Sequence, residues 1–77
     1  MKLKAESTSK IVTLITETGA VEARIWEATT EGGVRCHLYV TRVAVAPEQD
    51  QNQFELELEQ QREPTAEVAA IPLRLIL

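Results

Sequence analysis

The chain has 77 residues, a net charge of −4 and a single cysteine, which together predict one small domain without an internal disulfide. A domain of this size buries only about 60% of its unfolded surface, so self-association, most often as a closed dimer, is the expected route to further stability. The acidic balance disfavours a general nucleic-acid binder, since such affinity depends on neutralising phosphates with basic side chains.

The chain begins with a polar stretch, residues 1–9, which we expect to form a flexible N-terminal tail ahead of a single globular domain at 10–77. Residues 10–17, KIVTLITE, are rich in β-branched side chains and predict the first strand. Thr18 and Gly19 follow this run and form the expected turn.

The strongest signal is a predicted β-hairpin in which two β-rich runs, residues 20–30 and 34–46, flank Gly32 and Gly33. A two-residue turn at the glycines joins these runs, and at least one of the glycines should have a positive φ. Together with residues 10–17, the hairpin predicts an antiparallel three-stranded β-meander.

A turn of even length sorts the hairpin side chains onto two faces, because successive residues of a strand point to opposite sides. Cys36 then lies on the apolar face and is expected to be buried. The other face pairs Trp26 with Tyr39, which is either a structural aromatic pair worth about 0.2–1 kcal/mol or part of a binding patch. The candidate interaction surface on this face consists of Arg24, Trp26, Arg35, His37 and Tyr39.

The acidic segment after the hairpin supports two interpretations. Apolar residues alternate with glutamates over residues 54–59, which is a strand pattern and would make the protein an all-β small barrel. Strong helix formers, a capping-box pair at Asp50 and Gln53, and a stop at Pro64 favour a helix at 50–61. We adopt the helix, packed on the apolar face of the meander, and therefore predict the α+β class.

The C-terminal region predicts a short helical turn capped by Thr65 and then an apolar strand at 71–77. An exposed strand this apolar would be prone to aggregation through its unpaired edge. We therefore expect it to be covered by the core, paired into the sheet or paired with another chain. The residues of this candidate dimer or edge strand are Leu73, Leu75, Ile76 and Leu77.

No catalytic, cofactor or metal site is predicted. Cys36 and His37 are neighbours in a strand and point to opposite faces, so they cannot form a thiol–imidazole pair. The only serines, Ser7 and Ser9, lie in the expected tail, and the chain has neither a phosphate-binding glycine loop nor a zinc-ligand pattern. These observations predict that the protein is not an enzyme.

The leading hypothesis is a non-enzymatic protein interaction module that self-associates as a homodimer. One alternative is a nucleic-acid-associated accessory protein that uses the face with Trp26, Tyr39 and the arginines. Another is an acidic inhibitor that presents its glutamate-rich helix to a basic partner. No apolar run approaches the roughly 18 residues of a membrane span. No apolar stretch follows the early lysines, as a secretory signal requires, and the unpaired cysteine fits the cytoplasm.

Overall fold

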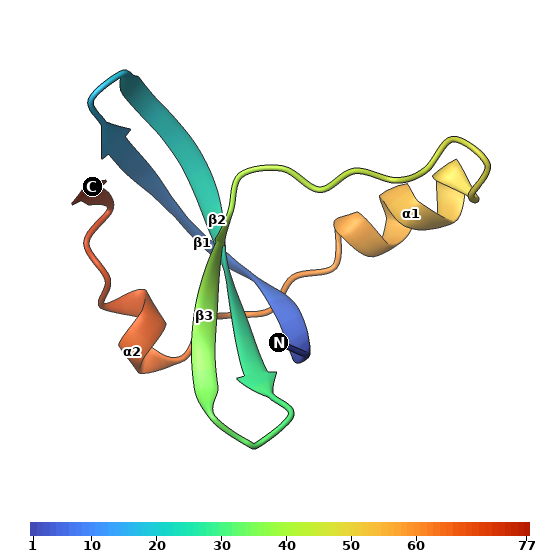
Figure 1. The fold of residues 1–77 in the computed structure, drawn as a ribbon, viewed down its shortest axis with the longest axis horizontal. Helices are drawn as coiled ribbons and strands as arrows, with labels where there is room; N and C mark the ends of the chain where they lie inside the picture. Colours follow the sequence, from blue (N-terminus) through green and yellow to red (C-terminus); the bar gives the residue numbers. More distant parts are fainter.

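The computed structural model describes residues 1–77 and has an α+β fold, with one curled four-stranded sheet shaped like half of a barrel (Figure 1). The strand order is β3-β2-β1-β4, with β4 parallel to β1 and the other neighbours antiparallel. This arrangement confirms the predicted class and meander. The elements are β1 (Leu3–Thr16), β2 (Gly19–Thr30), β3 (Arg35–Val40), α1 (Gln51–Leu58), α2 (Ala66–Ala69) and β4 (Arg74–Ile76).

The first strand begins at Leu3, so the prediction of a tail at residues 1–9 is wrong. The stretch from Leu3 to Ser7 pairs with β2 from Thr30 back to Trp26. These bonds join backbone groups, so they form without the apolar alternation that marks a half-buried strand. The polar side chains of this stretch hid the strand in the sequence.

A bulge interrupts β1 just after this polar stretch. The pairing with β2 shifts from Ser7 opposite Trp26 to Ile11 opposite Arg24. Residues 8–10 of β1 therefore stand opposite a single residue of β2. Extra residues in one strand bend it and increase its twist, which accounts for the curl of the sheet at this point.

Thr8 occupies the centre of the bulge and is completely buried. Its hydroxyl donates to the carbonyl of Ile25 at 2.6 Å and accepts from the backbone N–H of Lys10 at 3.2 Å. Its own carbonyl accepts from Nη1 of Arg24 at 2.9 Å. Thr8 thus satisfies backbone groups that the interrupted ladder leaves without partners.

The bulge also holds the segment between the two helices. The N–H of Arg62 donates to the carbonyl of Ser7 at 3.1 Å, and the N–H of Ser9 donates to the carbonyl of Arg62 at 2.9 Å. This parallel bridge beside Thr8 fixes where the chain returns to the sheet after α1.

The hairpin between β2 and β3 closes with a three-residue loop, residues 31–33, instead of the expected two-residue turn. The N–H of Thr30 donates to the carbonyl of Val34 and its carbonyl accepts from the N–H of Gly33, each at 2.9 Å, and Gly33 has a φ of +87°. The Thr30 hydroxyl also accepts from the N–H of Val34 at 3.0 Å. A turn followed by a left-handed glycine is the usual three-residue hairpin loop, and it confirms the predicted positive φ at this tip.

The odd loop changes the pairing of the hairpin. Trp26 lies opposite Leu38, and Tyr39 lies opposite Ile25, so the predicted pair of Trp26 with Tyr39 is wrong. The even loop would have gathered the apolar residues of β3 on the core face. β3 is an edge strand whose side chains all keep some exposure to solvent. Placing polar and apolar side chains on the same face of β3 therefore costs little folding stability.

The chain leaves the sheet at Val40, six residues before the predicted end of the strand. The alternation of apolar residues breaks at this point. Helix α1 then begins where the capping box predicts, since the carboxylate of Asp50 accepts from the N–H of Gln53 at 3.0 Å. It ends at Leu58, three residues before the predicted end at residue 61.

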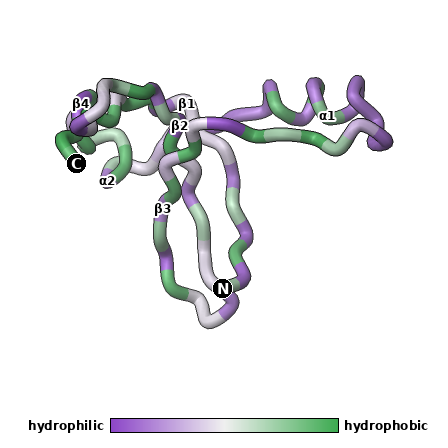
Figure 2. Tube along the Cα trace, turned by 45° about the horizontal axis from the view of Figure 1, so that its top comes forward, coloured by the Kyte–Doolittle hydropathy of each residue, from purple (hydrophilic) through white to green (hydrophobic).

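Helix α1 has no buried residue and stands away from the sheet in both views (Figures 1 and 2). The expectation that it packs on the apolar face of the meander is therefore wrong. Helix α2 takes that place with Val68, which is 5% exposed. The small core consists of Val12, Leu14, Ala23, Ile25 and Val68, with Ile71 and Leu75 packed against it.

The C-terminal strand is paired into the sheet, which is one of the arrangements expected for it. The N–H of Thr13 donates to the carbonyl of Leu73 at 2.7 Å, and the N–H of Leu77 donates to that of Ile15 at 2.9 Å. Regular pairing covers only 74–76. Leu75 contacts the core, whereas Leu73, Ile76 and Leu77 are 66%, 85% and 73% exposed.

Replacing Thr8 with valine tests the role assigned to the bulge. Thr8→Val keeps the side-chain shape but leaves the buried carbonyl of Ile25 and the N–H of Lys10 without this partner. We expect a loss of about 1–3 kcal/mol in the free energy of unfolding, measured by urea denaturation. Thr29→Val, at an exposed position of β2, should change it little. Equal midpoints for the two variants would contradict this role.

Candidate functional site

The hairpin register separates the five residues of the predicted interaction surface. Arg24 and Trp26 lie on one face of the sheet. Arg35, His37 and Tyr39 lie on the other face, beside the core and α2. The five residues therefore do not form a single surface.

The residues of β3 on the core face have partners of their own. Arg35 forms an ion pair with Glu67 of α2 at 3.2 Å, and both side chains are largely exposed. The imidazole Nε2 of His37 lies 3.1 Å from the hydroxyl of Tyr39, and the two rings meet edge to face. These contacts give the three residues structural roles along the exposed edge of the sheet.

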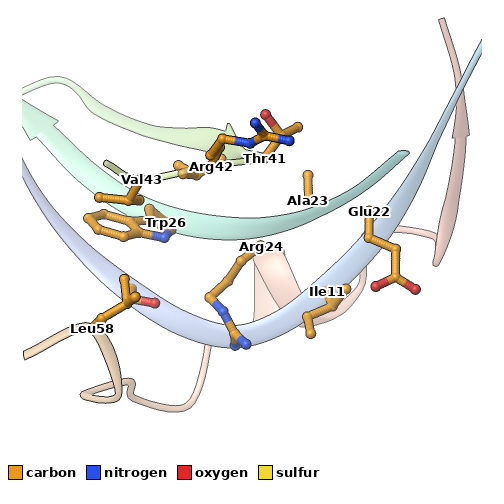
Figure 3. Close-up of a pocket in the computed structure, with 11 residues that line it drawn as sticks. Ile11, Glu22, Ala23, Arg24, Trp26, Thr41, Arg42, Val43 and Leu58 are labelled. Carbon is orange, nitrogen blue, oxygen red and sulfur yellow. The ribbon is translucent and has the colours of Figure 1, made fainter. Parts of the chain in front are cut away.

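The opposite face carries a groove of about 300 Å³ between the sheet, the segment after β3 and the end of α1 (Figure 3). Six of its 11 lining residues are apolar. We call it the Trp26 groove and define it by Ile11, Arg24, Trp26, Arg42, Val43 and Leu58.

Several apolar side chains of the Trp26 groove remain open to solvent. Ile11, Val43 and Leu58 are 42%, 38% and 45% exposed. Figure 3 shows the Trp26 indole beside Val43, with Leu58 on the α1 side. An aromatic ring with aliphatic neighbours and flanking arginines is the composition typical of the centre of a protein interface.

Arg24 fixes the floor of the groove. Its Nη1 donates to the carbonyl of Thr8 at 2.9 Å and to Oε1 of Gln61 at 2.8 Å. The guanidinium therefore ties β2 to the bulge and to the segment after α1. Arg42 differs, because it is exposed and forms no ion pair within the chain.

Sequence reasoning missed Ile11, Val43 and Leu58 as members of this site. Ile11 belongs to a β-branched run that predicts only a strand, and Leu58 belongs to the segment that predicts a helix packed on the apolar face of the meander. The signal that could have found the groove is the odd hairpin loop, which sets Leu38 beside Trp26. The sequence pattern favours an even loop instead, because an odd loop mixes polar and apolar residues on one face.

A partly buried ion pair anchors α2 on the other side of the sheet. The side chain of Glu27 is only 12% exposed and accepts from Nη2 of Arg62 at 3.1 Å and from the N–H of Thr65 at 2.7 Å. Burial opposes ionisation of this carboxyl, but the Thr65 N–H and the Arg62 guanidinium outweigh it and hold the pKa of Glu27 below its ordinary value.

The structure places no three His, Cys, Asp or Glu side chains where they could hold a metal ion. Cys36 is partly exposed instead of buried as expected, because the odd loop moves it off the core face. Neither helix has the length and apolar character needed to cross a bilayer. Comparisons of the chain with known protein families, with curated proteins and with solved structures found no match.

The Glu27 ion pair predicts a pH-dependent stability. A lowered carboxyl pKa contributes stability that is present above the ordinary value of 4.5 and is lost as the pH falls through the lowered pKa. Glu27→Gln should therefore lower the melting temperature clearly at pH 7, and the difference from wild type should shrink below pH 4.5.

Glu22→Gln is the matched control, since Glu22 lies on the same strand, is exposed and forms no ion pair. Thermal unfolding followed by circular dichroism at several pH values measures the effect. A Glu27→Gln difference that stays constant from pH 7 to pH 3 would show that the charge of Glu27 contributes nothing.

Proposed function

We propose that the protein is a non-enzymatic interaction module that self-associates as a homodimer through the Trp26 groove. The observation that carries this proposal is the accessible surface of the single chain, which is 6087 Å². A folded monomer of 8.6 kDa ordinarily exposes about 4,700 Å². The chain thus leaves about 1,400 Å² more surface open than its mass predicts.

The dimensions of the molecule support the same proposal. The Cα radius of gyration is 13.9 Å, whereas a compact domain of 77 residues has about 11.5 Å. The difference comes from α1 and its connecting segments, which extend beyond the sheet (Figure 1). A chain of this shape gains stability when a second chain fills the space beside α1.

The open surface includes apolar side chains that favour association. Only seven of the 77 residues are buried, which is a small core for a chain without a disulfide. A standard interface buries about 800 Å² on each partner, and the surplus surface is large enough to supply this area. The Trp26 groove is a concave part of this surface, and the side chains of Ile11, Val43 and Leu58 in it are each more than a third exposed.

The nucleic-acid alternative loses its main support. It depended on Trp26 and Tyr39 forming one platform for stacked bases, and the two rings lie on opposite faces. The inhibitor alternative keeps one supporting observation, because α1 projects with two exposed glutamates, Glu55 and Glu57. A basic protein partner is therefore the second candidate, and the partly exposed free Cys36 fits a reducing cytoplasm for both candidates.

Sedimentation velocity over a range of concentrations tests the self-association. We expect a monomer on dilution and a dimer at high concentration. Emission from Trp26, the only tryptophan, should move to shorter wavelength as the groove loses water. A chain that stays monomeric at every concentration would contradict the proposed self-association. A basic protein partner would then be the remaining candidate.

The same substitution at two sites locates the interface. Val43→Lys adds a charge to the groove, and Val34→Lys adds one at the hairpin tip, where the side chain is 63% exposed. Val43→Lys should raise the dimer dissociation constant at least about tenfold, as expected for a central interface residue, and Val34→Lys should not. Equal effects of the two would place the interface elsewhere.

A further inference from the structure

We infer that in the dimer α1 of each copy covers the Trp26 groove of the other, with Leu56 inserted into it. This inference rests on the proposed self-association and adds the element that each copy contributes. It concerns the arm, which we define as residues 41–61 between the end of β3 and the return of the chain at Arg62.

The arm is held at both ends and has few partners in between. Val40 pairs with Arg24 of β2 at one end, and the backbone of Arg62 is bonded to the bulge at the other. Helix α1 contributes no buried residue between these two points. A helix of eight residues is marginal in water by itself, so its stability requires packing against another surface.

The two sides of α1 point in different directions. Leu58 lines the groove of its own chain. Leu56 is two residues away and lies about 200° around the helix, so it faces away from that groove and is 62% exposed. The helix thus presents one leucine to its own sheet and another to a neighbouring molecule.

The charges of the arm favour a second copy as the occupant. The arm carries five acidic residues and, beyond Arg42, no basic one: Glu48, Asp50, Glu55, Glu57 and Glu59. None of the five forms an ion pair within the chain. With Arg42 the arm carries a net charge of −4, which is the charge of the whole chain, so the remaining residues are neutral in sum. An acidic arm therefore meets no net repulsion from the sheet body of the other copy, and the groove presents the free Arg42 as a basic partner.

The groove offers Leu56 a matching apolar surface. Ile11 and Val43 are partly exposed there, beside the ring of Trp26. A twofold axis repeats each contact, so two leucines and two grooves are covered in one closed interface. The arrangement buries the surfaces of the arm and the groove that the single chain leaves open.

Leu56→Lys tests this arrangement, because the residue is exposed in the single chain and its replacement leaves the core unchanged. The matched control is Ile76→Lys on β4, which is 85% exposed and marks the other apolar surface. Sedimentation should show at least about a tenfold weaker dimer for Leu56→Lys and an unchanged dimer for Ile76→Lys. Unchanged circular dichroism confirms folding of both.

The results separate the inference from the proposal on which it rests. A dimer that survives Leu56→Lys but dissociates with Ile76→Lys overturns the contact through α1, while self-association stands and moves to β4. A dimer unaffected by either substitution also overturns it. A wild-type chain that never dimerises removes the proposed function itself.

Cross-linking identifies the contact directly. Two chains of different mass, one with Leu56→Cys and one with Val43→Cys, both with Cys36→Ala, are mixed and oxidised. We expect a disulfide between them, because the contact brings position 56 of one copy to position 43 of the other. The pair of Leu56→Cys with Val34→Cys should not cross-link. Equal yields from the two pairs would overturn the inference.

Discussion

The buried hydroxyl of Thr8 is the interaction on which the rest of the structure depends. It lies where three residues of β1 face one residue of β2, and it satisfies backbone groups that the bulge removes from the ladder. The bulge bends β1 and gives the sheet its curl. It also turns the edge of the strand toward Arg62, whose backbone bonds there fix the path of the chain between the two helices.

Two different surfaces follow from this anchor. After Arg62, the ion pair with Glu27 directs the chain into α2, and Val68 closes the core on one face of the sheet. Before Arg62, the chain forms α1, which the bulge holds beyond the edge of the sheet, so the face with Trp26 stays open. One bulge thus accounts for both the small core and the groove, and it explains why a chain of 77 residues exposes so much surface.

Much of the fold could be predicted from local signals: the meander from its β-rich runs, α1 from the cap at Asp50, and the C-terminal strand from its leucines. The groove could not be predicted, because it depends on whether the loop between β2 and β3 has an odd or an even number of residues. Gly33 serves a two-residue or a three-residue turn equally well, and its φ of +87° belongs to the latter. The bulge was also hidden, since a buried threonine within a polar stretch has no sequence signature.

Isotope-filtered nuclear magnetic resonance on a dimer of one labelled and one unlabelled copy measures the central contact most directly. If α1 of each copy covers the groove of the other, the methyl groups of Leu56 will show intermolecular Overhauser effects to the indole of Trp26. A dimer in which the Leu56 methyl groups show effects only to protons of their own chain would contradict the account.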